Sequence, residues 1–394
     1  MEEVVVVSGV RTAVGTFGGM FKDVAATDLG AAVIKATLEQ AGIEGSQVEE
    51  VIFGSAGQVA ELNYVARVSA VKAGLPVDVP AFNVNRLCGS GLQAINSAAQ
   101  EIQTGYSEIV VAGGAENMSQ FPYLSRKTRW GSRMGHIEME DGLIGALNCP
   151  FNHYHMGVTA ENLAEKYSIS RAEQDEFALR SHQRAIAAID AGRFKDQIVP
   201  IRVPQPKGEP KVADTDEHPR RDTSLERLAK LGPAFKPNGT VTAGNASGLN
   251  DAAAAVLMMS ASKARALGLK PRVRVVSMAA AGVEPSIMGI GPVSATRRAL
   301  RSAGLTLDDM DVIELNEAFA AQAIAVDREL KVDWDKTNPN GGAVALGHPV
   351  GATGAILVVK IMNELERVRA RYGLVTLCIG GGQGIATIFE RLDN

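Results

Sequence analysis

One of the three cysteines in this chain of 394 residues directly precedes a glycine-rich turn. Residues 85–95 read NRLCGSGLQAI, so Cys88 lies where we expect a helix to begin, near Gly89. The unpaired N–H groups and positive dipole end of that helix would face the sulfur, which lowers a thiol pKa and favours the nucleophilic thiolate. A small buried hydrophobe is the alternative for a free cysteine. Gly89 and Gly91 favour a nucleophile, because packing alone does not require them.

A histidine between glycine turns could supply the base that such a thiol needs. His348 stands in the segment GHPVGATGA, residues 347–355. A histidine beside a cysteine acts as a general base and generates the thiolate. The helix expected after His348 matches the one after Cys88 in an internal repeat, so the two groups could meet across a pseudo-two-fold axis. A purely structural histidine is the weaker alternative, since glycines flank this one on both sides.

A second cysteine precedes three glycines in the segment LCIGGGQG, residues 377–384. A thiol beside a nucleophile suggests proton transfer, with Cys378 acting as acid and base. Free backbone N–H groups at Gly380–Gly382 could bind an oxyanion. A disulfide between Cys88 and Cys378 is a competing interpretation, but the odd number of cysteines and the lack of a secretion signal argue against it.

An asparagine follows another expected strand, in the segment NEAFAAQ, residues 316–322. Asn316 lies where that strand turns into a helix, a position that suits a simple N-cap. As a functional group, its amide could orient a water molecule in a polar site. Both interpretations remain open from the sequence.

The elements that must position these residues alternate along the chain. Short apolar runs ending in small residues are separated by helix-like stretches, which is typical of buried strands joined by crossover helices in an α/β fold. Four early segments return in the same order near the C-terminus. The pairs are 4–10 with 273–282, 49–57 with 310–319, 89–98 with 351–360, and 108–118 with 374–384. We infer a duplicated half-domain, the alternative being a general likeness of α/β segments. Two such halves would place equivalent strand ends around one crevice.

The amino-acid composition of the chain changes between the two halves. We divide it into an N-terminal half of residues 1–119 plus 250–270, an insertion of residues 120–249, and a C-terminal half of residues 271–394. The insertion is rich in proline, charge and polar loops, and it is a plausible place for substrate recognition. Within it, Ser170 and Glu173 form a capping box and predict a helix that ends at Gly192.

The amino-acid composition indicates a globular protein and argues against nucleic-acid binding and membrane insertion. The chain is 46% hydrophobic and 21% charged, which is ordinary for a globular protein of two or more domains. A net charge of -4 argues against nucleic-acid binding. The apolar runs stop well short of the roughly 18–20 residues that a membrane span requires. With few cysteines and no recognisable targeting segment, we expect a cytoplasmic protein that binds neither nucleic acid nor membrane.

The four glycine-flanked motifs together resemble a known family. NRLCGSGLQAI, NEAFAAQ, GHPVGATGA and CIGGGQG are similar to the signature stretches of the thiolases, that is, the acetyl-CoA acetyltransferases and β-ketothiolases. The resemblance extends over essentially the whole chain and is greatest to the biosynthetic-type bacterial thiolases. Ketoacyl synthases pair cysteine with two histidines or with histidine and asparagine, whereas this chain has a second cysteine. The resemblance implies a thiolase fold of two duplicated mixed-sheet halves stacked as αβαβα layers, with a large loop insertion in the first half.

The resemblance also implies a mechanism. Cys88 would accept an acyl group from acetyl-CoA, and His348 would be its base. Cys378 would then remove an α-proton from a second acetyl-CoA, so that the enolate attacks acetyl-Cys88 and forms a 3-oxoacyl-CoA. His348 and a water held by Asn316 would form one oxyanion hole, and the N–H groups of Cys88 and Gly380 the other.

The same resemblance implies a binding site for coenzyme A as substrate, with no prosthetic group and no metal. Arg220 is favoured over Arg221 for the nucleotide, Phe235 could cover the adenine, and Ser247 and Ala243 would meet the pantetheine. His155 would lie beside the pantetheine as well. The residues expected along the acyl group are Met156, Met288, Ala318 and Phe319. The family commonly forms tetramers as dimers of dimers, so we expect a homotetramer that binds CoA and acyl-CoA thioesters.

Two alternatives and one departure accompany this hypothesis. A catalytically silent CoA-binding scaffold would not need all four reactive positions, and a nucleotide-dependent oxidoreductase would need a GxGxxG after the first strand, which is missing.

The segment CPFNHYHMG, residues 149–157, carries an extra cysteine and histidine. Cys149, His153 and His155 lack an obvious fourth metal ligand, so we do not expect a metal there. The altered loop leaves the acyl-chain preference open.

Overall fold

The two halves of the chain contribute strands to one mixed sheet. The computed structural model describes residues 2–393. The N-terminal strands are β1 (Val4–Arg11), β2 (Gly15–Thr16), β3 (Glu50–Gly54), β4 (Ala81–Val84), β5 (Ile109–Asn117) and β10 (Asn250–Ser260). The C-terminal strands are β11 (Val273–Gly282), β12 (Val312–Leu315), β13 (Tyr372–Ile379) and β14 (Gln383–Arg391). The strand order is β12-β13-β14-β11-β1-β10-β5-β3-β4, with β2 beside β10.

The order and direction of the strands confirm the duplication inferred from the sequence. In the first half β1 pairs with β10, β10 with β5, and β5 with β3; in the second half β11 pairs with β14, β14 with β13, and β13 with β12. The first two pairings of each half are antiparallel and the third is parallel. The half-sheets meet where β1 pairs with β11 over only two residue pairs, Val5 with Arg274 and Val6 with Val273.

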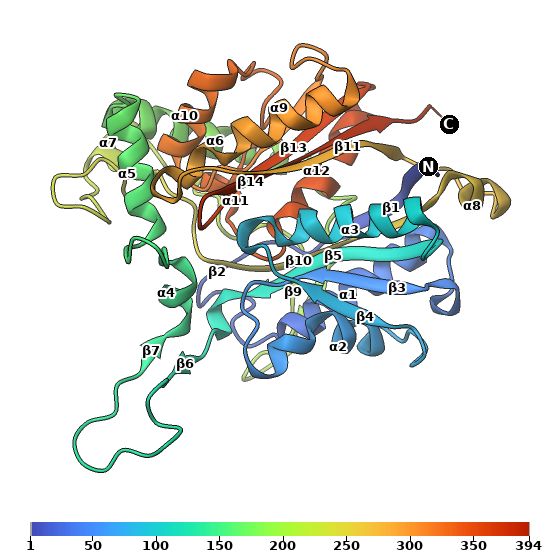
Figure 1. The fold of residues 1–394 in the computed structure, drawn as a ribbon, viewed down its shortest axis with the longest axis horizontal. Coiled ribbons are helices and arrows are strands. Elements are labelled where there is room, and N and C mark those ends of the chain that lie inside the picture. The colour runs from blue at the N-terminus through green and yellow to red at the C-terminus, as the bar shows by residue number, and fades with distance from the viewer. Residues whose placement is uncertain (1, 394) are drawn as a thin grey trace.

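Helices cover the half-sheets in three layers, so that five layers stack along the molecule (Figure 1). The helices of the halves are α1 (Ala26–Ala41), α2 (Val65–Lys72), α3 (Ser90–Thr104), α8 (Ala261–Ala266), α9 (Gly291–Ala303), α10 (Ala320–Leu330), α11 (Ala343–Leu346) and α12 (Thr353–Val368). Buried side chains of α1 and α2 pack on the outer face of the N-terminal sheet, and those of α9 and α10 on the outer face of the C-terminal sheet. Helices α3 and α12 share the central core with strands of both halves. The αβαβα arrangement expected from the resemblance is confirmed.

The central layer places two helix starts side by side. In the sequence repeat, α3 matches α12, and the two helices contact each other between the sheets. Glycines allow this close approach, since a Cβ on Gly354 in α12 would lie 2.2 Å from the backbone nitrogen of Leu92 in α3. Each helix follows a segment that carries a candidate catalytic residue, Cys88 before α3 and His348 before α12.

The insertion leaves and returns between two neighbouring strands, because β5 and β10 pair directly from Asn117 opposite Asp251. Its elements are β6 (Tyr123–Leu124), β7 (Glu140–Asp141), α4 (Gly142–Leu147), α5 (Met156–Lys166), α6 (Arg171–Asp190), β8 (Ile201–Val203), β9 (Lys211–Ala213) and α7 (Leu225–Ala229). The capping box of Ser170 and Glu173 begins α6 as predicted. No helix within residues 2–393 is long and apolar enough to cross a membrane.

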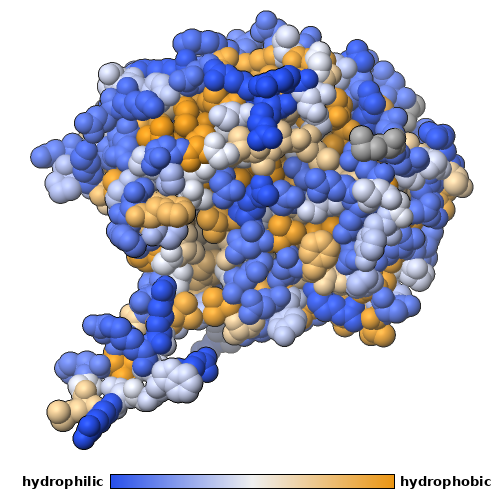
Figure 2. All heavy atoms as spheres, viewed as in Figure 1, coloured by the Kyte–Doolittle hydropathy of each residue, from blue (hydrophilic) through white to orange (hydrophobic). Residues whose placement is uncertain are grey.

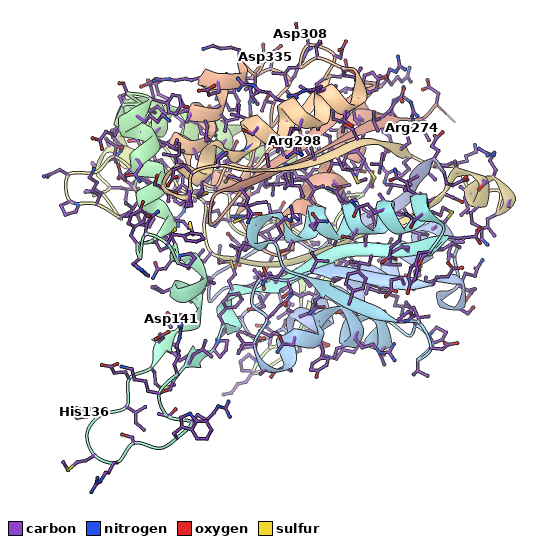
Figure 3. The ribbon with its side chains drawn as sticks, in the orientation of Figure 1. His136, Asp141, Arg274, Arg298, Asp308 and Asp335 are labelled. Atoms are coloured by element: carbon purple, nitrogen blue, oxygen red, sulfur yellow. The ribbon has the colours of Figure 1, made fainter. Side chains whose placement is uncertain are left out.

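One part of the insertion projects from the body as an arm (Figure 1). Strands β6 and β7 form its base, and Figure 3 shows His136 and Asp141 along it. Figure 2 shows hydrophobic residues exposed on this arm, which stands clear of the rounded body. Two large side chains of the segment between β6 and β7 are almost fully exposed, Trp130 at 92% and Met134 at 95%. Such large apolar side chains in water indicate a contact surface.

Candidate active site

The structure brings the Cys88 sulfur beside the turn that follows Cys378. Cys88 lies in a 3-10 turn, Leu87–Gly89, directly before α3, and Cys378 lies one residue from the end of β13. The backbone N–H of Gly380 donates a hydrogen bond to the Cys88 sulfur, and both residues line one cavity. Burial, and then the charge of the nearby Cys88, raise the pKa of Cys378 well above its ordinary value. All three cysteines are free thiols, so the disulfide considered above is absent.

Cys88 is a weaker acid than we predicted from the sequence. Burial raises the pKa of the Cys88 thiol, and this effect outweighs the hydrogen bonds from the N–H groups of Gly380 and of Cys88 itself, which lower it. The helix α3 begins at Ser90, next to Gly89 as predicted, but the net lowering of the thiol pKa that we expected is wrong, because burial outweighs the groups that lower it. The resting group is a neutral thiol, which needs a base.

His348 is held in the tautomer that suits such a base. Its Nδ1 lies 2.7 Å from Oγ1 of Thr353, whose own hydroxyl donates to the carbonyl of Pro349 at 2.9 Å. Because the single hydroxyl proton is already used, Nδ1 carries the proton and donates to Thr353. Nε2 therefore holds a lone pair, and it has no hydrogen-bond partner among the described residues. Burial lowers the pKa of His348 to about 4, so the ring is neutral at pH 7.

The loop that carries His348 packs against the segment that carries Cys88. Val350 lines the same cavity as Cys88, and the two belong to one hydrophobic cluster. A Cβ on Gly91 in α3 would lie 3.0 Å from the carbonyl oxygen of Gly351. The backbone N–H of His348 donates to Oδ1 of Asn250 at 2.8 Å, which fixes the start of the loop to β10.

Asn316 carries a buried side-chain amide that has no hydrogen-bond partner among residues 2–393. Its backbone N–H donates to the carbonyl of Thr376 at 3.0 Å, which places it beside β13. Its side chain is fully buried, yet neither Nδ2 nor Oδ1 has a hydrogen-bond partner in the described part of the chain. The N-cap alternative is wrong, because α10 begins after Phe319. An unpaired buried amide is costly unless a water or ligand satisfies it, so the geometry favours the interpretation as a water-orienting group.

An apolar wall surrounds Cys378. Four expected acyl-group neighbours belong to the same buried cluster as this thiol: Met156, Met288, Ala318 and Phe319. The loop with Ser247 runs alongside, because the N–H of Ser247 donates to the carbonyl of Ala318 at 2.9 Å. Ala243 is exposed in the same loop. The residues expected for acyl and pantetheine binding therefore lie near one another.

Phe235 lies against this wall rather than open to solvent on both faces. Its ring stacks on His155 with centroids 4.7 Å apart and meets Phe319 edge-on at 5.9 Å. The ring face turned to His155 is thus not available to an adenine, which we had expected Phe235 to cover. His155 itself caps α5, since its Nδ1 accepts a hydrogen bond from the N–H of Gly157 at 3.0 Å.

Comparison with known proteins decides the family. The model of the thiolase N-terminal domain matches residues 4–262, and that of the thiolase C-terminal domain matches residues 269–391.

The chain belongs to the thiolase family.

Among its relatives, beta-ketothiolase BktB of Cupriavidus necator is 58% identical over 392 residues, 99% of each chain. An acetyl-CoA acetyltransferase of Pseudomonas aeruginosa is 57% identical over 392 residues, 99% of this chain and 100% of that one. The crystal structure of the Bacillus anthracis acetyl-CoA acetyltransferase has a TM-score of 0.97 at 48% identity and covers 100% of this chain and 99% of its own. Human mitochondrial 3-ketoacyl-CoA thiolase in complex with CoA has a TM-score of 0.96 at 45% identity, covering 99% and 98%.

The two arginines expected near the nucleotide have different surroundings in this thiolase. Arg221 forms a bidentate ion pair with Asp190, at 2.6 and 3.0 Å. Arg220 is exposed, and its guanidinium has no ion pair within the described part of the chain. Its backbone N–H donates to Nδ1 of His182 at 3.2 Å, which holds the chain while leaving the side chain free. A guanidinium in this state is available to an anion.

The altered loop of residues 149–157 holds no metal cluster. No group of three or more His, Cys, Asp or Glu among residues 2–393 is placed to bind a metal ion. Cys149 is buried in the same hydrophobic cluster as Cys378, and its carbonyl accepts a hydrogen bond from the N–H of His153 at 2.9 Å. The extra cysteine therefore packs as a hydrophobic residue.

Sequence reasoning missed three residues that hold the site together. They are Thr353 and Asn250, which fix the His348 ring and loop, and Glu116, a buried carboxylate at the end of β5. Glu116 stands in the segment of residues 108–118, which we had treated as one member of the internal repeat. A carboxylate inside an apolar strand was the available signal, because a buried acid must be hydrogen-bonded.

Proposed function

We propose that the protein is an acetyl-CoA C-acyltransferase, which condenses acetyl-CoA with an acyl-CoA to form a 3-oxoacyl-CoA and CoA, and which runs thiolysis in reverse. Relatives named acetyl-CoA acetyltransferase and beta-ketothiolase, matched over nearly their whole length, support this function. The observation that carries it is the buried Nε2 of His348, which has no hydrogen-bond partner among residues 2–393, on a loop packed against the segment of Cys88. A silent CoA-binding scaffold is not favoured, since it needs none of these reactive groups.

The first half of the reaction acylates Cys88. The thiol proton passes to Nε2 of His348, and the sulfur attacks the thioester carbonyl of acetyl-CoA. The N–H groups of Cys88 and Gly380 bind the oxyanion of the adduct. In comparable sites each such N–H donor contributes about 3–4 kcal/mol of transition-state stabilisation. The bond to CoA then breaks, and the departing thiolate takes the proton of Cys378. The step exchanges one thioester for another and is therefore reversible.

The second half forms the carbon–carbon bond. Cys378, now a thiolate, removes an α-proton from a second acetyl-CoA, and its raised pKa makes it a strong base for this purpose. Protonated His348 and a water held by Asn316 stabilise the enolate oxygen. The enolate attacks acetyl-Cys88, the Cys88 thiolate leaves, and it recovers its proton from His348. All three groups return to their starting protonation states.

We assign coenzyme A to the region between the insertion and the C-terminal half as a substrate and not a prosthetic group. The exposed guanidinium of Arg220 would meet the nucleotide phosphates. Ser247, Ala243 and His155 would contact the pantetheine, and Phe235 would cover the adenine through the ring face that is not stacked on His155. Met156, Met288, Ala318 and Phe319 would contact the acyl group. A bound CoA in a related thiolase structure supports the ligand.

The division of the chain suits this function. The half formed by residues 1–119 and 250–270 would supply Cys88, the half of residues 271–394 the other reacting groups, and the insertion of residues 120–249 the CoA and assembly contacts. The exposed apolar side chains on the arm support a homotetramer built as a dimer of dimers. The three free thiols support a reducing, cytoplasmic location.

A single assay tests the proposal. The protein is mixed with acetoacetyl-CoA and CoA, and loss of the enolate absorbance is followed. We expect turnover by reduced wild-type protein, none by Cys88→Ala, and full turnover by Cys149→Ala, which removes a thiol outside the proposed chemistry. Absence of turnover by freshly reduced wild-type protein contradicts the function.

A further inference from the structure

Glu116 is a buried carboxylate that binds backbone groups from two distant parts of the chain. Its side chain is only 2% exposed. Oε2 accepts hydrogen bonds from the N–H of Ala56 at 2.7 Å and from the N–H of Gly351 at 2.8 Å. Oε1 accepts from the N–H of Gly57 at 3.1 Å. Three N–H donors on one buried carboxylate form a built site and not an incidental contact.

The donors Ala56 and Gly57 belong to a segment that is hydrogen-bonded to the residues before Cys88. Ala56 and Gly57 follow β3, and the carbonyl of Ala56 accepts a hydrogen bond from Nδ2 of Asn85 at 3.3 Å. Oδ1 of Asn85 in turn accepts from the N–H of Leu87 at 3.0 Å. Leu87 precedes Cys88 and has a φ of 45°, a conformation that its surroundings must hold in place.

The donor Gly351 belongs to the loop that carries His348. Gly351 lies in the turn between His348 and Thr353, the residue that orients the imidazole. This turn lies close to two glycine backbones, because a Cβ on Gly114 would lie 2.3 Å, and one on Gly54 2.7 Å, from the carbonyl oxygen of Gly351. A Cβ on Gly351 itself would lie 2.5 Å from Oε2 of Glu116. The carboxylate is thus packed directly onto the His348 loop.

We propose that Glu116 is a positioning residue, which holds the Cys88 and His348 segments at the separation needed for proton transfer from thiol to imidazole. The inference deepens the proposed function and rests on it. One side chain ties the N-terminal half to the C-terminal half at the point where their reacting groups meet. Glu116 touches no substrate in this scheme and acts through the backbone.

Electrostatics and positioning make opposite predictions for this residue. The negative charge of Glu116 raises the pKa of the Cys88 thiol, after burial itself. If charge alone mattered, Glu116→Gln would make Cys88 a better nucleophile. If positioning matters, the same change places an amide N–H₂ against backbone donors, loosens the contact and makes Cys88 a poorer one.

The test measures alkylation of Cys88 by iodoacetamide at pH 8, followed by peptide mass spectrometry. Burial raises the pKa of Glu116 to about 7, so its carboxylate is mostly ionised at this pH. Cys88 is half-buried, whereas Cys149 and Cys378 are at most 1% exposed, so mapping assigns the reaction. We expect Glu116→Gln to slow alkylation about tenfold, with CoA affinity changed less than twofold. Glu116→Asp, which withdraws the carboxylate by one methylene, serves if the Gln variant does not fold. Unchanged or faster alkylation in a folded variant overturns the proposal.

Glu50→Gln is the matched control. Glu50 is also a buried carboxylate, 5% exposed, but it lies at the opposite end of β3 and pairs in register with Val110. Burial raises the pKa of Glu50, and it raises that of Glu116 to about 7. We expect Glu50→Gln to leave the alkylation rate of Cys88 within twofold of wild type. An equal loss in both variants means that a general loosening of the core, and not Glu116, is responsible, and this contradicts the proposal.

A double-mutant cycle with His348→Asn separates positioning from structural damage. If Glu116 acts through His348, the change Glu116→Gln slows alkylation less than threefold once the imidazole is gone. A full tenfold loss in that background contradicts the proposal. The assay needs no acyl-CoA, so a wild-type protein that alkylates rapidly but fails to accept an acetyl group refutes the proposed function and not the role of Glu116.

Discussion

Thr353 determines which nitrogen of His348 can accept a proton. Its Oγ1 lies 2.7 Å from Nδ1 of His348 while its own proton goes to the carbonyl of Pro349. The lone pair of the imidazole is thereby directed to Nε2, which is buried and unpartnered within residues 2–393. This relationship makes the catalytic histidine a base and not a donor in the resting protein.

Replacing Thr353 by valine removes the acceptor for Nδ1–H and frees the ring to rotate or to change tautomer. We expect the rate of Cys88 acetylation by acetyl-CoA to fall about tenfold, in line with the ~1–2 kcal/mol of a buried hydrogen bond. Thr353→Ser keeps the hydroxyl and should restore most of the rate. Rapid-quench measurement of the acetyl-enzyme checks both variants, and equal rates in the valine and serine variants would show that the hydroxyl does not matter.

The protonation of His348 gives a second prediction. Burial lowers its pKa from 6.5 to about 4, so the ring should remain neutral down to pH 5.5. The unfolded chain takes up this proton first, so the His348 contribution to stability is lost as pH falls from 6.5 towards 4. NMR of protein labelled in its histidine rings, assigned with His348→Asn, measures the titration. A midpoint near 6.5 for His348 would contradict a dry, buried imidazole.

Replacing Cys378 by alanine should separate the two half-reactions. Cys378→Ala retains Cys88, His348 and the N–H of Gly380, so radiolabelled acetyl-CoA should still label the protein at Cys88. Condensation should fall by at least a thousandfold, because no base remains for the α-proton. Acetoacetyl-CoA formation and label incorporation are measured on the same sample. Loss of labelling to the same extent as condensation would refute the division of labour.

The neighbouring arginines offer a comparison within one segment. Arg220→Ala removes a guanidinium without an ion pair in the described chain, and we expect KM for CoA to rise about fivefold to tenfold with kcat little changed. Arg221→Ala breaks only an exposed pair with Asp190, which should cost little. Steady-state thiolysis at varied CoA and ionic strength checks this. A larger effect from Arg221 would reverse the assignment.

Much of the fold was predictable from the chain, because repetition is visible in the residues themselves. The pairing of segment 49–57 with 310–319 predicted that β3 and β12 are equivalent, and the strand order agrees. The Ser170–Glu173 capping box predicted the start of α6 for a local reason that needs no tertiary information.

The failures come from contacts that only the fold creates. The pKa of Cys88 was predicted from its own helix, but burial decides it, and the residues around the thiol come from the insertion and from both halves of the chain. Glu116 was overlooked because two of its partners, Ala56 and Gly351, contribute backbone N–H groups that carry no signal in the sequence. Thr353 was overlooked because one hydroxyl in a helix start becomes informative only once its neighbour His348 is placed.

The central claim is that Cys88 carries an acyl group handed over by acetyl-CoA. The most direct measurement is mass spectrometry of the reduced, folded protein after brief exposure to acetyl-CoA, with fragmentation of the peptide containing residues 85–95. We predict one acetyl group at Cys88, removed by added CoA and absent from Cys88→Ala. An unmodified Cys88, or an acetyl group found only on another residue, contradicts the account.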